Sequence, residues 1–84
     1  MNFVIAVFSS RSETLSFANF LKRQGFVCGV VQTPKEAGRT CGISVKFRYE
    51  DFATIKQIFG SLRFMSFQGF FLEQSGNSFQ RRRI

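Results

Sequence analysis

Residues 3–25 read FVIAVFSSRSETLSFANFLKRQG, an unbroken apolar run followed by an amphipathic segment. The run from Phe3 to Phe8 is apolar on both faces, which is typical of a strand in the middle of a sheet. Ser10 and Glu13 have the spacing of a capping box, so a helix is expected to begin there and to end at Gly25. The residues expected on its buried side are Leu15, Phe17, Ala18, Phe20 and Leu21.

The following segments alternate between strand and loop signals. Residues 26–32 are apolar and partly β-branched, which predicts a second strand. Residues 33–40 include the only proline and a glycine, so they are expected to form a loop. Between Ile43 and Arg48 apolar and polar residues alternate, which predicts a strand whose solvated face carries Ser44, Lys46 and Arg48.

The last third of the chain predicts one more helix and one more strand. Five apolar residues recur there at helical spacing, with Glu50 or Asp51 as the N-cap and Gly60 near the end: Phe52, Ile55, Ile58, Phe59 and Leu62. Residues 64–72 then form the expected final strand.

The resulting order is strand, helix, strand, strand, helix, strand. It favours an α+β ferredoxin-like βαββαβ fold: a four-stranded antiparallel sheet in the order 4-1-3-2, with two helices on one face. We expect residues 1–73 to form this single domain and residues 74–84 to be a basic, flexible tail.

Composition narrows the classes of function. The chain has 84 residues and no histidine, which excludes a histidine base or ligand, and its two cysteines cannot complete a four-ligand zinc site alone. These absences remove many classes of enzyme, and we expect no metal and no cofactor. No apolar stretch is long enough to span a membrane, and the N-terminal run lacks the basic residues of a signal peptide, which indicates a cytoplasmic protein with reduced thiols.

Two further features of the composition leave alternatives open. Thirteen phenylalanines either fill the small core or lie partly on an exposed sheet face that associates. Three of the twelve basic residues behind the net charge of +7 are Arg81–Arg83, so much of the basicity belongs to the expected tail. Such a run is usually a solvated segment rather than a nucleic-acid site.

The predicted topology brings Cys41 close to the start of the first helix. Residues 8–12, 33–42 and 60–63 are expected to meet at one edge of the sheet. The helix N-terminus carries partial positive charge and would stabilise a thiolate, while Gly42 leaves room for a second chalcogen atom. The cations that could add to this effect are Arg11, Lys35, Arg39 and Arg63. Alternatively, Cys41 is a small residue without chemistry at a loop-to-strand junction.

Cys28 lies within the second predicted strand, where an inert, buried cysteine is expected. A hairpin around the loop would place it about opposite Lys46, roughly 16 Å from Cys41 at the rise of a strand. A disulfide requires Cα atoms within about 7 Å, so we expect none between these cysteines.

Residues 31–47, VQTPKEAGRTCGISVKF, carry a resemblance to a known family. The chain resembles the selenium/sulfur carrier protein-like family of small bacterial and archaeal proteins, over roughly residues 3–72. It departs from the family pattern in the loop at 37–39 and in the turn at 9–11. The resemblance implies that Cys41 carries the chalcogen. The residues expected to support it are Pro34, Glu36, Arg39, Gly42, Ser10 and Arg11.

Three functions remain open at this stage. In the first, Cys41 accepts sulfur or selenium from a donor such as a cysteine desulfurase and passes it to an acceptor protein, as a carrier rather than an enzyme with its own turnover. The second is a nucleic-acid module, which is disfavoured because residues 39–46 match the RNA-recognition signature only at Arg39 and Gly42. The third is a ligand-sensing or assembly module, in which two copies could pair through an open sheet face lined by Ile5, Val7, Val45 and Phe67, among others.

Overall fold

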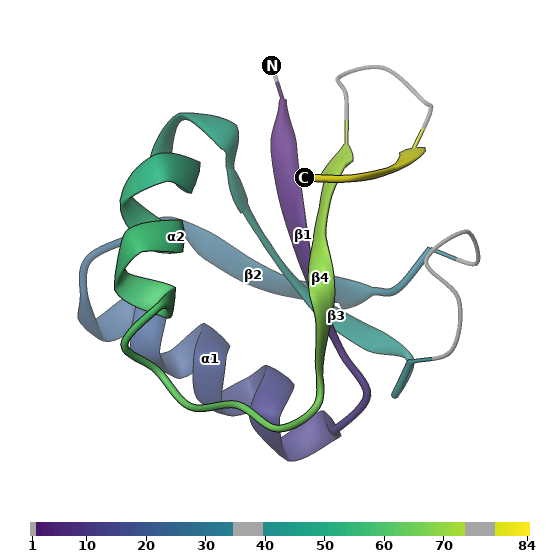
Figure 1. Ribbon diagram of the computed structural model, residues 1–84, viewed down its shortest axis with the longest axis horizontal. Coiled ribbons are helices and arrows are strands. Elements are labelled where there is room, and N and C mark those ends of the chain that lie inside the picture. Colours follow the sequence, from purple (N-terminus) through teal and green to yellow (C-terminus); the bar gives the residue numbers. More distant parts are fainter. Residues whose placement is uncertain (1, 35–39, 74–78) are drawn as a thin grey trace.

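The computed structural model describes residues 2–34, 40–73 and 79–84 (Figure 1). Within this part of the chain the elements are, in order, β1 (Phe3–Phe8), α1 (Arg11–Arg23), β2 (Cys28–Gln32), β3 (Ile43–Arg48), the 3-10 helix η2 (Tyr49–Asp51), α2 (Phe52–Phe59), β4 (Phe67–Glu73) and β5 (Phe79–Arg83).

The strands form one antiparallel sheet in the order β2-β3-β1-β4-β5. Helices α1 and α2 lie on the same side of it (Figure 1). The first four strands have the predicted order and direction, so the ferredoxin-like prediction is confirmed. Strand β1 is the centre of the sheet because β3 and β4 pair with its two edges, and this explains why its sequence is apolar on both faces.

The fifth strand differs from the sequence prediction, which assigned residues 74–84 to a flexible tail. Strand β5 pairs with β4, with Phe71 opposite Arg83 and Glu73 opposite Phe79. Beyond it, the Ile84 amide donates to the Phe70 carbonyl at 2.9 Å and its side chain packs on the core. The outer edge of β4 offers amides and carbonyls that a further strand satisfies, whatever its side chains. Residues 79–83 therefore form a strand, which the run of arginines in the sequence did not indicate.

Helix α1 begins at the predicted N-cap, but its capping arrangement includes a third residue. The Ser10 hydroxyl accepts from the Glu13 amide at 3.2 Å, as in a capping box. The Glu13 carboxylate, however, accepts from the amides of Met65 and Ser66 at 3.0 and 2.8 Å, and the Ser10 amide donates to the Ser66 hydroxyl. The Ser66 hydroxyl also donates to the Glu13 carboxylate, and this bond, ahead of those from the two amides, lowers the pKa of Glu13. Ser66 thus ties the start of α1 to the segment that leads into β4.

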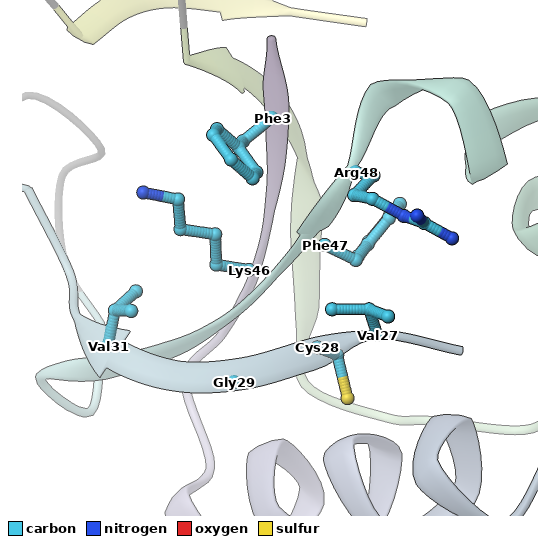
Figure 2. A pocket seen from close by; sticks show the side chains of 8 residues that line it. All are labelled: Phe3, Val27, Cys28, Gly29, Val31, Lys46, Phe47 and Arg48. Atoms are coloured by element: carbon cyan, nitrogen blue, oxygen red, sulfur yellow. The ribbon is translucent and has the colours of Figure 1, made fainter. Parts of the chain in front are cut away.

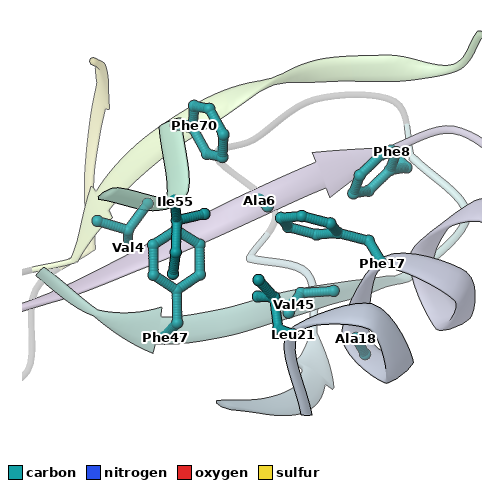
Figure 3. Close-up of a cluster of buried hydrophobic side chains, with 10 residues drawn as sticks. All are labelled: Val4, Ala6, Phe8, Phe17, Ala18, Leu21, Val45, Phe47, Ile55 and Phe70. Atoms are coloured by element: carbon teal, nitrogen blue, oxygen red, sulfur yellow. The ribbon is translucent and has the colours of Figure 1, made fainter. Parts of the chain in front are cut away.

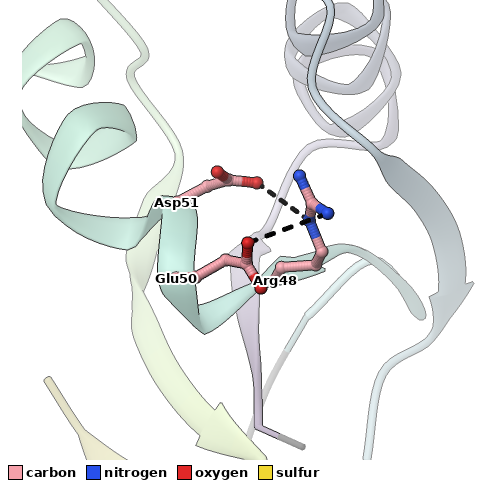
Figure 4. Close-up of polar contacts among 3 residues, drawn as sticks. All are labelled: Arg48, Glu50 and Asp51. Atoms are coloured by element: carbon pink, nitrogen blue, oxygen red, sulfur yellow. Dashed lines mark hydrogen bonds and ion pairs between the residues drawn. The ribbon is translucent and has the colours of Figure 1, made fainter.

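Helix α2 begins without the predicted side-chain cap. Asp51 occupies the N-cap position but makes no capping hydrogen bond. Its carboxylate instead accepts from Arg48 Nε at 3.2 Å, and Arg48 also lies 3.8 Å from Glu50 (Figure 4). The turn of 3-10 helix before α2 makes this clasp possible, because it brings the acidic side chains back over the end of β3.

The core lies between the sheet and the two helices and is rich in phenylalanine (Figure 3). Phe8 is fully buried, and its ring lies 5.2 to 6.5 Å, centroid to centroid, from four others: Phe17, Phe59, Phe64 and Phe67. These rings fill the core, which agrees with the first of the two interpretations of the phenylalanine content.

The opposite face of the sheet does not have the predicted composition. Ile5, Val7 and Phe71 form a second buried cluster there. Val45 and Phe67 point to the helix side instead, because Val45 pairs with Ala6 and Phe67 with Phe8. The four residues expected to line one open face therefore lie on two, and the predicted pairing surface is wrong.

Candidate functional site

Two backbone hydrogen bonds, one at Cys41 and one at Gly42, hold the end of the loop before β3. The Cys41 amide donates to the Phe8 carbonyl at 3.4 Å, and the Thr33 amide donates to the Gly42 carbonyl at 2.9 Å. The end of β1 and this loop therefore meet as predicted. The third segment differs: the Ser9 amide donates to the carbonyl of Ser66 at 2.9 Å, a residue beyond the predicted 60–63.

Cys41 is half-buried, and its sulfur lies beside the first turn of α1, where the topology predicted it. It lies 3.5 Å from Thr14 Oγ1 and 3.4 Å from the Ile43 carbonyl oxygen. Thr14 is fully buried, and its hydroxyl also donates to the Ser10 carbonyl at 2.9 Å. The sulfur thus contacts one hydroxyl that can donate or accept and one carbonyl that only accepts.

Gly42 shapes the backbone next to the thiol. Its φ is +96°, a conformation that residues with a side chain rarely adopt. The Thr40 hydroxyl accepts from the Gly42 amide at 3.0 Å and holds the turn. Apart from its two chain neighbours, no described residue has a heavy atom within 4 Å of the position that a Cβ at Gly42 would take. Gly42 is therefore uncrowded on this side, and the room for a second chalcogen atom at the Cys41 sulfur stays a prediction.

Within the described part of the chain, the polar contacts of the thiol are to one hydroxyl and one carbonyl. Among the described residues, Arg11 and Arg63 are exposed, and the sulfur's hydrogen bonds are to Thr14 and Ile43. Pro34 is half-buried at the start of the loop, and Ser10 acts as the helix N-cap. The remaining supporting residues, Glu36 and Arg39, lie outside the described part of the chain, as does Lys35.

A buried hydroxyl pair closes the base of the loop, and the sequence analysis missed it. The hydroxyls of Thr33 and Ser44 are 2.6 Å apart, and Ser44 is fully buried rather than on a solvated face. The hairpin register was predicted one residue off: Phe47, not Lys46, lies opposite Cys28. With the correct register, Thr33 and Ser44 would have been expected on the same face where the hairpin loop begins, and their contact could have been predicted.

Cys28 has a different environment from Cys41. Its thiol donates to the Ala18 carbonyl at 3.6 Å and points towards α1 (Figure 2). Burial raises the pKa of Cys28, and the nearby charge of Lys22 opposes this only in part. Cys28 therefore stays a neutral thiol near pH 7, which is a weak nucleophile. Both cysteines are free, so the prediction that no disulfide links them is confirmed.

A cavity of about 170 Å³ lies along β2 and β3, away from Cys41 (Figure 2). Lys46 on its wall forms an ion pair of 2.6 Å with Glu73 and lies 4.4 Å from the centre of the Phe3 ring. Arg48 is held by the acidic clasp described above. The lining residues are Phe3, Val27, Cys28, Gly29, Val31, Lys46, Phe47 and Arg48. Its cations are thus already paired, and the cavity does not include the thiol that the sequence singles out.

Two kinds of feature are absent from the part of the chain that the structure describes. No group of three or more acidic, cysteine or histidine side chains is gathered there as a metal site would require. Neither helix among the described residues has the length and apolarity needed to cross a membrane.

Comparison with known proteins decides the family. Residues 3–63 match the family described as "Putative Se/S carrier protein-like". The chain belongs to this family. No curated protein and no solved structure matches it. The matched region includes β1, α1, the loop with Cys41, β3 and α2, and it ends before β4 and β5.

Proposed function

We propose that this Se/S carrier-like protein transports a single chalcogen atom, sulfur or selenium, on the sulfur of Cys41. Membership of the family supports the role of a carrier with protein partners in general. The observation that carries the assignment to Cys41 is the position of its sulfur at the N-terminal turn of α1, 3.5 Å from the Thr14 hydroxyl.

The proposed loading step is an exchange between a thiolate and a persulfide. The Cys41 thiolate attacks the outer sulfur of a donor persulfide, R–S–SH, such as a cysteine desulfurase forms. A bond from Cys41 Sγ to the outer sulfur forms, the donor's S–S bond breaks, and its electron pair leaves on R–S⁻. Cys41 then holds –S–SH, and the proton stays on the transferred sulfur. Delivery to an acceptor thiolate is the same step in reverse, so the chain gains and loses one atom without turnover of its own.

The contrast between the two cysteines supports the choice of Cys41. Transfer requires an ionised nucleophile that a partner can reach. Both cysteines are half-buried, but the Cys28 thiol points towards α1 and burial raises its pKa, which makes it the poorer candidate nucleophile. Cys41 lies at the junction between a loop and β3, and its neighbour Gly42 has no side chain to crowd an additional atom.

The test compares matched single-cysteine variants. Wild type, Cys41→Ser and Cys28→Ser are each incubated with a cysteine desulfurase and free cysteine, and intact masses are recorded without reductant. Wild type and Cys28→Ser should gain about 32 Da, the mass of one sulfur atom, and Cys41→Ser should gain nothing. If Cys41→Ser gains the mass and Cys28→Ser does not, the carrier is Cys28 and the assignment to Cys41 is wrong. If wild type gains no mass, the sulfur-carrier role with this class of donor is refuted.

A further inference from the structure

The Thr14 hydroxyl lies within hydrogen-bond distance of the Cys41 sulfur, although neither group needs this contact while Cys41 is a neutral thiol. We propose that Thr14 is the residue that stabilises the Cys41 thiolate, by turning its hydroxyl hydrogen from the Ser10 carbonyl to the Cys41 sulfur when the thiol ionises. This inference rests on the proposed carrier function and adds to it a residue that acts on the reacting sulfur.

Cys41 and Thr14 share a small hydrogen-bond network with two backbone carbonyl groups. Cys41 and Thr14 each have one hydrogen to donate, and two carbonyl oxygens accept from them: Ser10 at 2.9 Å from Thr14 Oγ1, and Ile43 at 3.4 Å from Cys41 Sγ. In the thiol form both hydrogens have a carbonyl acceptor. The contact of 3.5 Å between the Thr14 oxygen and the Cys41 sulfur is then not needed to satisfy either group.

Ionisation changes this arrangement. A thiolate has no hydrogen for the Ile43 carbonyl and requires a donor instead. Thr14 can supply it by rotation of its hydroxyl hydrogen alone, because Oγ1 is already at hydrogen-bond distance from the sulfur. The Ser10 carbonyl keeps a partner, since it also accepts from the Thr14 amide at 3.0 Å. The exchange therefore leaves Ser10 satisfied and moves no heavy atom.

The same exchange acts in both directions of transfer. When the acceptor thiolate takes the outer sulfur of the loaded chain, the S–S bond breaks and the electron pair remains on Cys41 Sγ. A better stabilised leaving thiolate departs faster. Thr14 is fully buried, so water does not compete for its hydroxyl, and a hydrogen bond to a charged group is stronger there than at the surface.

The experiment removes the hydroxyl at Thr14 and measures Cys41 alone. Thr14→Val keeps the volume of the side chain, Thr14→Ala removes the hydroxyl with less bulk, and Thr14→Ser keeps the hydroxyl as the control. Alkylation by iodoacetamide is followed from pH 6 to 10 on tryptic peptides. Residues 40–46 carry Cys41 and residues 24–35 carry Cys28, which serves as the internal reference.

We expect Thr14→Val and Thr14→Ala to alkylate Cys41 roughly tenfold more slowly at pH 7, the effect of losing one hydrogen bond to a charged group. The limiting rate at high pH, where the thiol is fully ionised, should not fall, because a less stabilised thiolate is at least as nucleophilic. Thr14→Ser should stay within about twofold of wild type. Wild-type rates at pH 7 in the hydroxyl-free variants would overturn the inference, as would a Thr14→Ser variant as slow as Thr14→Val. Because this readout requires no sulfur donor, its failure is distinguishable from a failure of sulfur loading.

Discussion

The hydroxyl pair at the base of the Cys41 loop predicts an unequal response to two similar substitutions. Thr33 and Ser44 share one hydrogen bond of 2.6 Å, but Ser44 is fully buried and Thr33 only partly. Thr33→Val leaves the Ser44 hydroxyl without this partner and away from water. Ser44→Ala leaves the Thr33 hydroxyl without it but with access to solvent. The first change should therefore destabilise the fold more than the second.

The magnitudes follow from the cost of an unsatisfied polar group. A buried hydroxyl left without a partner costs about 1–3 kcal/mol, so Thr33→Val should lower the free energy of unfolding by that amount. Ser44→Ala loses only the net value of a hydrogen bond, about 0.5–1 kcal/mol. In the double variant no orphaned hydroxyl remains, so its loss should be smaller than the sum of the single losses.

The assay is urea unfolding of the three variants and wild type, followed by far-ultraviolet circular dichroism, with the slope of the free energy against urea held in common. Whole-domain stabilities are only about 5–15 kcal/mol, so shifts of this size are measurable. The reasoning is refuted if Ser44→Ala is as destabilising as Thr33→Val, or if the two losses add.

Three other perturbations test the fold around the site. Gly42→Ala meets no atom at its Cβ but places a side chain at a φ of +96°, so it should cost roughly 1–2 kcal/mol in urea unfolding, and an unchanged midpoint would contradict the assigned backbone. The lowered pKa of Glu13 means that its ionised form stabilises the folded chain above the ordinary value of 4.5 and that this contribution is lost as the pH falls below it. Glu13→Gln should therefore reduce stability at pH 7 and flatten the fall in stability between pH 5 and 3. A stability profile identical to that of wild type would exclude the contacts of Glu13 with Met65 and Ser66 as a cause of that fall. Phe8→Ala should cost about 3–5 kcal/mol, because it removes a fully buried ring from a cluster of four others, and a loss under about 1 kcal/mol would contradict the core assignment.

Local signals in the sequence were sufficient for much of the fold. Strand β1 has the predicted bounds because an apolar run followed by a capping serine leaves little choice. Gly25 ends α1 as expected, with a φ of +90°. The position of Cys41 beside α1 follows from topology alone, since the ends of β1 and of the loop must meet where β1 and β3 pair.

What the sequence could not show depended on contacts between distant segments. The contact of Glu13 with Ser66 crosses more than fifty residues, and no spacing rule reaches that far. Strand β5 is held by backbone pairing, to which the run of arginines gives no clue. A register error of one residue hid the Thr33–Ser44 pair, because a shift of one residue moves a side chain to the other face.

The most direct test of the account follows one sulfur atom through the wild-type chain. The protein is loaded by a desulfurase, separated from it, trapped with iodoacetamide and digested with trypsin, before and after exposure to an excess of a low-molecular-weight acceptor thiol. We expect an extra mass of about 32 Da on residues 40–46, none on residues 24–35, and transfer of that mass to the acceptor. Sulfur found on Cys28, or sulfur on Cys41 that the acceptor cannot remove, would contradict it.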